Sequence, residues 1–171
     1  MKLQHEDRYP LPVEDMFRVF TEKDFYEARY AGTDGRYEFV EFGPRGNTFV
    51  IDVKQHMKLR KGTALPAFAQ RFVRDENILR TTIEWDMTGG SERRGVHRFR
   101  IDGVPVEVQG SMRMSPAADG CRNLIELNVT CSIPLIGGQI ARMIAERAGA
   151  SLKKNHDSTL RYLVARGLVP A

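Results

Sequence analysis

Four polar side chains stand where the surrounding pattern calls for apolar ones, and they are the first candidates for chemistry. Gln55, Thr81 and His97 interrupt segments in which apolar and polar residues alternate, and His156 interrupts the apolar stripe of a helical segment. His97 has the widest chemical range, because an imidazole titrates near neutral pH and can act as acid, base or hydrogen-bond partner. It is therefore the candidate catalytic residue, with Gln55 or Thr81 orienting a substrate.

Each of these residues also has a structural interpretation. A histidine, amide or hydroxyl on a buried face is commonly a core group whose hydrogen bonds are satisfied within the protein or by water. The sequence leaves both interpretations open.

Motifs of hydrolases and metal sites are absent from the sequence. There is no Gly-x-Ser-x-Gly, no His-Glu-x-x-His and no paired cysteine knuckle, and the four histidines lack ligand spacing. We therefore expect no metal and no cofactor. Arg94, Arg98 and Arg100 share one face of one segment, but no aromatic residue shares that face, so we do not expect nucleic-acid binding.

The elements that must position these side chains are strands. Alternating polarity runs through six segments separated by glycine-containing turn signals, and it is clearest from Phe49 to Leu59. Turn signals of this kind are found at residues 43–47, 60–62, 88–91, 102–103 and 119–120. Consecutive strands joined in this way form an antiparallel meander.

Helical patterns flank the meander. A short strand from Leu3 to Tyr9 precedes it, with two short helices between Pro12 and Gly32. After it, Pro134 to Gly167 predicts one helix about 50 Å long, enough to cross a sheet. Residues 63–77, with Phe68 and Phe72, are too many for a hairpin turn; they form either a packed connector or a lid.

Composition indicates a single globular domain over residues 1–171. Hydrophobic residues make up 42% and charged residues 28%, with a net charge of +4. The N-terminus is charged where a signal peptide is apolar, and no apolar run reaches the roughly 18 residues that span a bilayer. We expect a cytoplasmic protein with no integral membrane segment, and the sequence leaves the oligomeric state open.

The order of strand, two short helices, six-stranded meander and long C-terminal helix resembles the START-like or helix-grip (SRPBCC) superfamily. That superfamily includes the birch-pollen allergen, lipid-transfer domains, polyketide cyclases and coenzyme-Q-binding proteins. The resemblance extends from Lys2 to Gly167, and the Trp85 strand, residues 105–110 and residues 133–138 are similar to an uncharacterised bacterial branch of it. It implies an α+β fold in which a curved antiparallel sheet of about seven strands wraps round the C-terminal helix.

The same resemblance implies a hydrophobic ligand in a cavity between sheet and helix. The residues with the parity of the concave face, together with His156 on the helix, are the candidate ligand-binding residues: Phe39, Gln55, Met57, Thr81, Trp85, His97, Phe99, Met112 and His156. Methionine adapts to irregular shapes and aromatic rings stack on flat molecules, which would suit a planar or isoprenoid ligand.

Three functions follow as hypotheses. The first is a binder or carrier of a lipid, isoprenoid or polyketide-like aromatic molecule. The second is a cyclase or dehydratase-type enzyme that uses His97. The third is a protein-interaction module that acts through Arg94, Arg98 and Arg100, or through the connector at Phe68 and Phe72.

Overall fold

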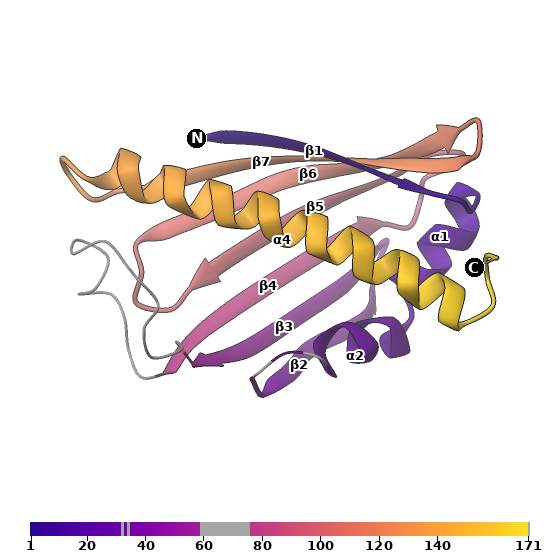
Figure 1. The fold of residues 1–171 in the computed structure, drawn as a ribbon, viewed down its shortest axis with the longest axis horizontal. Helices are drawn as coiled ribbons and strands as arrows, with labels where there is room; N and C mark the ends of the chain where they lie inside the picture. Colours follow the sequence, from indigo (N-terminus) through magenta and orange to yellow (C-terminus); the bar gives the residue numbers. More distant parts are fainter. Residues whose placement is uncertain (32, 34, 59–75, 171) are drawn as a thin grey trace.

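The computed structural model describes residues 1–31, 33, 35–58 and 76–170. It confirms the predicted α+β helix-grip architecture, in which a long helix runs obliquely across one face of a curved antiparallel sheet (Figure 1). The elements follow in the order β1 (Lys2–Tyr9), α1 (Val13–Phe20), α2 (Lys23–Ala31), β2 (Tyr37–Arg45), β3 (Thr48–Lys58), β4 (Glu76–Asp86), β5 (Arg93–Ile101), β6 (Val106–Ala117), β7 (Gly120–Cys131) and α4 (Gly137–Ala165).

The sheet has seven strands in the order β1-β7-β6-β5-β4-β3-β2. Strands β2 to β7 form the predicted meander, and β1 pairs antiparallel with β7, so that Tyr9 lies opposite Cys121. The β6–β7 turn depends on Gly120, whose φ of 135° is unfavourable for other residues. The first strand of the chain is thereby fixed beside the last.

The long helix α4 begins later than predicted. Pro134 was expected to open it, whereas the helix starts at Gly137, because Leu135 has a φ of 67° and cannot continue a right-handed helix. At the other end the helix stops before Gly167, as predicted, and Gly167 has a left-handed backbone with a φ of 66°. Neither α4 nor the other helices in the described ranges are apolar over a length that could cross a membrane.

Helix α4 lies on the sheet through a face of mostly small and aliphatic side chains. Ala141, Ala145 and Ala148 are buried, as are Leu152 and Leu163. The small side chains let the helix approach β7 and β1 closely, against which it mainly packs. Strands β3 to β5 are not among the elements against which α4 mainly packs.

Helices α1 and α2 close one end of the space under α4 (Figure 1). Helix α1 buries Val13, Met16 and Phe20 on one face, and Glu14 stands in its first turn. The predicted connector or lid at residues 63–77 falls outside the described residues, apart from Glu76 and Asn77, which begin β4.

Candidate ligand-binding site

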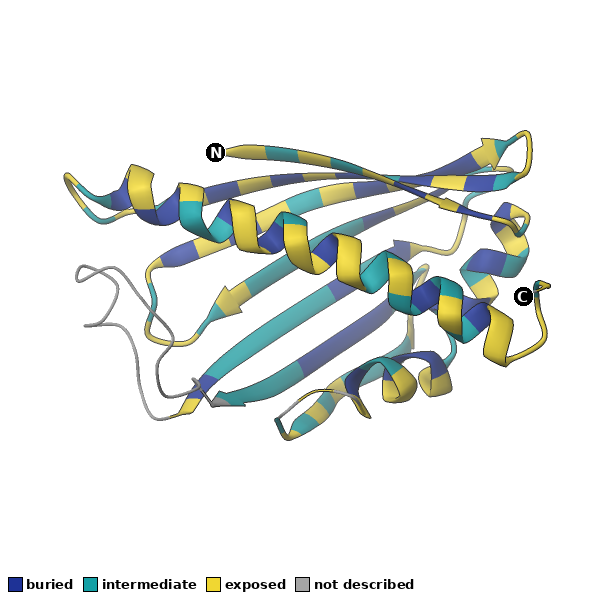
Figure 2. Ribbon diagram, viewed as in Figure 1, coloured by how far each residue is buried: buried dark blue, intermediate teal, exposed yellow. Residues whose placement is uncertain are grey.

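The face of the sheet beneath α4 divides into two halves that differ in burial (Figure 2). The closed half, next to α1 and α2, consists of Ile51, Ile83, Trp85, Met112 and Met114, all buried. The open half consists of five side chains of the same parity that remain partly exposed: Gln55, Met57, Leu79, Thr81 and Phe99. The two halves are continuous along the strands. Thr81 pairs with Val53 and Phe99, and two residues farther along β4, Ile83 pairs with Ile51 and His97.

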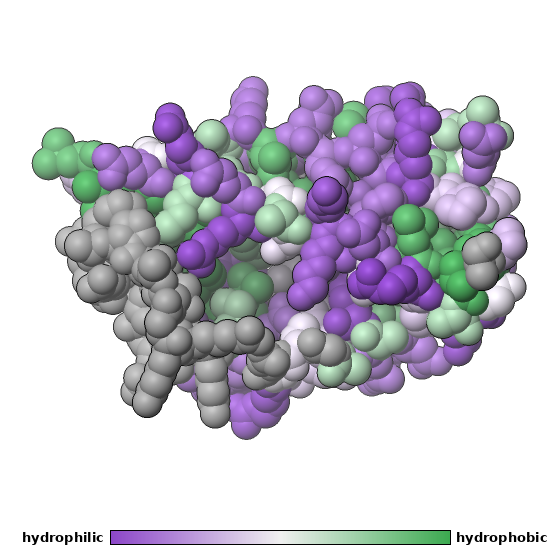
Figure 3. All heavy atoms as spheres, viewed as in Figure 1, coloured by the Kyte–Doolittle hydropathy of each residue, from purple (hydrophilic) through white to green (hydrophobic). Residues whose placement is uncertain are grey.

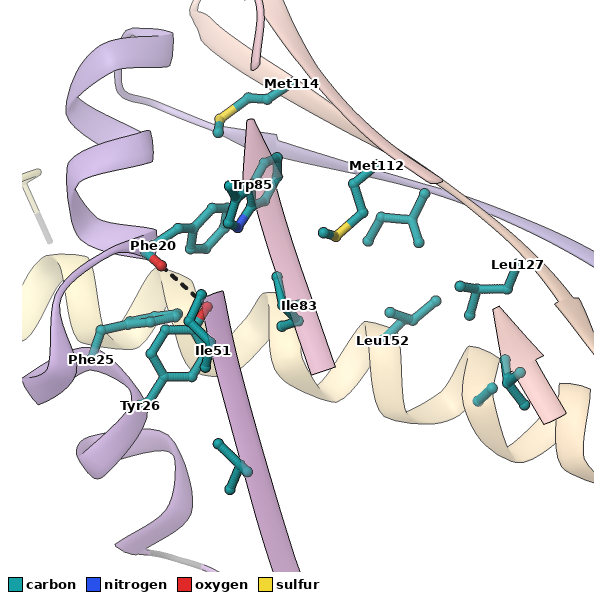
Figure 4. Packing of buried hydrophobic residues seen from close by; sticks show 14 of the residues in the cluster. Phe20, Phe25, Tyr26, Ile51, Ile83, Trp85, Met112, Met114, Leu127 and Leu152 are labelled. Carbon is teal, nitrogen blue, oxygen red and sulfur yellow. Dashed lines mark hydrogen bonds between the residues drawn. The ribbon is translucent and has the colours of Figure 1, made fainter. Parts of the chain in front are cut away.

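Trp85 is the centre of the closed half. Its ring stacks on Phe20 with centroids 6.0 Å apart and an interplanar angle of 13°, and Phe17 meets it edge-on at 6.2 Å. Figure 4 shows Trp85, Phe20 and Tyr26 converging from β4, α1 and α2, with the Tyr26 hydroxyl donating to the Phe20 carbonyl at 3.2 Å. Aromatic packing from three elements therefore seals this end.

A cavity of about 60 Å³ lies between the closed half and α4. Its apolar wall includes Ile83, Trp85, Met112, Ile125 and Leu152, and Figure 4 shows Leu152 of α4 directed toward Ile83 and Met112. This volume holds roughly four water molecules. It is large enough for the end of a ligand but not for a whole one.

Polar side chains also line the cavity: Asp7, Tyr9, Arg29, His97, Asn123 and Asn155. Asp7 and Tyr9 form a buried network on β1, in which Asp7 Oδ1 contacts His5 Nε2 at 2.8 Å and Asp7 Oδ2 accepts from the Tyr9 hydroxyl at 3.1 Å. Burial, together with the negative charge of Asp7, raises the pKa of Tyr9 well above its usual value. Tyr9 therefore stays a hydrogen-bond donor, and both carboxylate oxygens of Asp7 have partners.

Arg29 extends from α2 to the cavity. One guanidinium nitrogen, Nη2, donates to Thr159 Oγ1 on α4 at 3.2 Å, and the guanidinium carbon lies 4.5 Å from the centroid of the Phe25 ring. Among the described residues, no carboxylate lies within ion-pair distance of Arg29. Arg29 is thus a positive charge in the site without an ion-pair partner among the described residues.

His97 reaches the same cavity from β5. Burial, and secondarily the charge of Arg29, lowers the pKa of His97 from 6.5 to about 4. His97 is partly exposed and lines the cavity. At neutral pH the ring is uncharged and able both to donate and to accept a hydrogen bond.

Three residues of the cavity lining each have one buried side-chain atom without a hydrogen-bond partner within the described ranges: Arg29 Nε, Trp85 Nε1 and Asn123 Oδ1. Buried polar atoms of this kind are rare in folded proteins, and each costs stability when unsatisfied. Two donors and one acceptor on residues of the cavity lining therefore remain unsatisfied in the described part of the chain.

The structure distributes the predicted ligand-binding residues over several places. Trp85, His97 and Met112 line the cavity, whereas Gln55, Met57, Thr81 and Phe99 lie in the open half. Phe39 is on β2, where its ring meets Phe42 edge-on at 5.4 Å. His156 contacts the Arg8 carbonyl through Nε2 at 3.0 Å and so ties α4 to β1.

The sequence analysis did not identify Asp7, Arg29 and Asn123. A signal for two of them exists, because Asp7 and Asn123 stand at buried positions of β1 and β7 and lie opposite each other. Arg29 could have been noticed as a charge that follows Phe25 and Tyr26 on the buried side of α2. Its proximity to the cavity depends on how α2 docks on α4, which no local pattern specifies.

Two of the three predicted arginines on the convex face have carboxylate partners. Arg98 donates to Glu84 at 2.6 Å, Arg94 lies 3.9 Å from Glu92, and Arg100 is exposed. Glu84 also accepts from Arg45 at 3.0 Å. Much of the positive charge on this face is therefore balanced locally.

Comparison with known sequences finds one matching family and similar mycobacterial proteins. A family described as "Protein of unknown function (DUF2505)" matches residues 4–163. Uncharacterised proteins of Mycobacterium tuberculosis and Mycobacterium bovis are each 27% identical over 146 residues, which cover 80% of this chain and 81% of theirs.

Comparison with solved structures shows the same fold in distant proteins. A START superfamily protein from Mycobacterium smegmatis is 10% identical, with a TM-score of 0.55 over 95% of this chain and 97% of that one. Human STARD10 is 15% identical, with a TM-score of 0.55 over 94% and 63%. The protein TTHA0849 from Thermus thermophilus is 17% identical, with a TM-score of 0.57 over 95% and 99%. At these identities the likeness establishes the START-like fold.

Proposed function

This chain belongs to the DUF2505 family and has a START-like fold, and from these premises we propose that it binds a hydrophobic small molecule between the sheet and α4. The ligand lies along the open half and extends one end into the cavity. A lipid, an isoprenoid or a polyketide-like aromatic molecule is the class of ligand that such a surface suits. The protein then acts as a binder or carrier.

The observation that supports this proposal most strongly is the partial exposure of the open half. Met57, Leu79 and Phe99 are large apolar side chains on three adjacent strands, and they lie on the face that elsewhere forms the core. Figure 3 shows a hollow on this side of the molecule below α4, with apolar side chains at its floor. An apolar surface in a concave position is the usual form of a small-molecule site.

The size of the cavity determines how the ligand is accommodated. Sites for drug-sized ligands have volumes of about 300–1,000 Å³, whereas the cavity in the closed half has about 60 Å³. The closed half therefore holds only one end of the ligand, and the open half contacts the rest.

The properties of His97 favour binding over acid–base catalysis. A general base works best when its pKa is near the working pH, and the pKa of His97 is lowered to about 4. At neutral pH the ring is a weak base but a competent hydrogen-bond partner. The cyclase or dehydratase hypothesis remains the alternative, and a reaction abolished by His97→Gln would favour it.

The first experiment is native mass spectrometry of the protein isolated from its own host, followed by organic extraction of any bound molecule. We expect a stoichiometric apolar adduct.

Displacement of the neutral fluorophore diphenylhexatriene then tests the location of the binding site with two variants of neighbouring residues on β5. Phe99→Glu places a charge on the open half and should abolish binding, whereas Arg100→Glu changes the convex face and should not. Equal binding by both variants would contradict the proposal.

A further inference from the structure

We propose that the cavity is an anion site centred on Arg29, and that the ligand is an apolar monocarboxylic acid whose carboxylate lies in the closed half while its chain lies along the open half. This inference rests on the proposed function and specifies the ligand class. It is based on two charged residues of the cavity lining: Arg29 has no carboxylate partner among the described residues, whereas both carboxylate oxygens of Asp7 have partners.

The surroundings of Arg29 hold the guanidinium without neutralising it. Thr159, which is only 1% exposed, accepts one hydrogen bond from Nη2, and the same hydroxyl donates to the Asn155 carbonyl at 2.8 Å. The rings of Phe25 and Tyr26 lie 4.5 and 5.5 Å from the guanidinium carbon. A cation fixed in this way against apolar rings is partly desolvated, which strengthens its attraction to an anion.

Asp7 does not supply that anion. Its Oδ1 contacts His5 and its Oδ2 accepts from Tyr9, and it forms no ion pair with Arg29. Arg29 Nε, by contrast, is buried without a hydrogen-bond partner in the described part of the chain. Both carboxylate oxygens of Asp7 therefore have hydrogen-bond partners, whereas the Nε donor of Arg29 has none in the described part of the chain.

The other unsatisfied atoms extend the same site. Trp85 Nε1 is a second donor on the lining, and the Asn123 amide offers its oxygen or, after rotation of the amide by half a turn, its nitrogen. A carboxylate has two oxygens that accept several hydrogen bonds, and arginine binds such groups well. The Arg29 guanidinium is thus the group that would hold it.

Charge balance favours a carboxylate over a phosphate. The cavity lining carries one positive charge from Arg29, while Asp7 carries a negative charge on the same lining. A dianionic phosphate would bring two negative charges to a site with a single cation and would be repelled by Asp7. A monocarboxylate brings a single negative charge, so it can pair with Arg29 and meets less repulsion from Asp7 than a dianion does.

The test compares decanoate with 1-decanol, which have the same number of carbon atoms and differ in the charge of the end group. Binding is measured by titration calorimetry at pH 7.5 for the wild type and Arg29→Met. We expect the wild type to bind decanoate at least tenfold more tightly than decanol. Arg29→Met should lose at least tenfold in decanoate affinity and keep its decanol affinity. Arg18→Met removes a charge from an exposed position on α1 and should change neither value.

The outcomes separate this inference from the proposed function. Equal affinity for both probes in the wild type, unchanged in Arg29→Met, would overturn the anion site and leave apolar binding intact. Failure of both probes to bind the wild type would overturn both. Should Arg29→Met not fold, Arg29→Lys keeps the charge but lacks the Nε donor, and its ratio of decanoate to decanol affinity should fall several-fold. An unchanged ratio would contradict the role of that donor.

Discussion

The closed and open halves of the concave face carry the same alternation of side chains but differ in what covers them. In the closed half, Phe20 of α1 stacks on Trp85 and Tyr26 of α2 donates to the Phe20 carbonyl, and the result is a packed aromatic core. In the open half, Thr81 and Phe99 have the same parity and remain partly exposed. The two halves therefore belong to the same strands and differ in whether other elements pack over them.

This difference separates stability from binding. Side chains that are fully enclosed contribute mainly to folding, because their apolar surface is already removed from water. Partly exposed apolar side chains on a concave surface have area left to bury against a ligand. We expect substitutions in the closed half to lower the free energy of unfolding and those in the open half to lower ligand affinity.

The largest expected effect is that of Trp85→Ala. Trp85 is 2% exposed and stacks on Phe20, so truncation should lower the free energy of unfolding by about 3–5 kcal/mol. Urea denaturation followed by circular dichroism measures the change. A loss below about 1 kcal/mol would mean that the closed half is not a packed core.

The alternation of Ile51, Val53 and Gln55 was enough to predict which face of the sheet is apolar, because the strand period fixes parity. It could not predict where the core ends along that face. Ile51 is buried and Gln55 is partly exposed although both have the same parity, so the extent of the core depends on packing between distant segments. The start of α4 was missed for a local reason, the left-handed backbone of Leu135.

A pH-dependent loss of stability is expected at the boundary between the halves, where His97 lies. Its pKa is about 4 in the folded protein and about 6.5 when unfolded, so the unfolded chain binds more protons between these values. Stability is fully present above pH 6.5 and should fall as the pH drops toward 4, by about 2–3 kcal/mol in total.

The measurement is a series of urea denaturation curves from pH 4 to pH 7.5 for the wild type and His97→Gln. The difference between the two profiles isolates His97 from the carboxyl groups that titrate near pH 4. A constant difference across this range would show that the folded environment does not oppose protonation of His97.

Gly95 provides a test of how tightly the closed half is packed. A Cβ at Gly95 would lie 2.8 Å from Trp85 Cε3, 2.9 Å from the Glu84 carbonyl oxygen and 3.0 Å from Met112 Cε. The carbonyl belongs to the sheet and cannot move aside, so Gly95→Ala should cost about 2 kcal/mol in urea denaturation. Gly90→Ala, where a Cβ meets nothing within 4 Å, is the matched control and should stay within about 0.5 kcal/mol of the wild type.

Strand parity also predicted part of the cavity lining. Trp85, His97 and Met112 were predicted from strand parity, and they line the cavity. Arg29 was not, because a helical arginine is usually solvated and only the docking of α2 against Thr159 of α4 brings it inward. The contact between Arg29 and Thr159 joins residues 130 positions apart, so the local sequence pattern around either residue does not predict it.

The smallest expected effect on stability is that of Phe99→Ala, the counterpart of Trp85→Ala in the open half. Phe99 is partly exposed, and its ring centroid is 6.0 Å from that of His97. Truncation removes little buried area and should cost about 1 kcal/mol. The same variant should show a smaller rise in melting temperature with saturating 1-decanol than the wild type, because a ligand stabilises only as far as it binds the folded state. If Phe99→Ala were as destabilising as Trp85→Ala, both halves would be core, and the surface available to a ligand would shrink to the cavity beside Arg29.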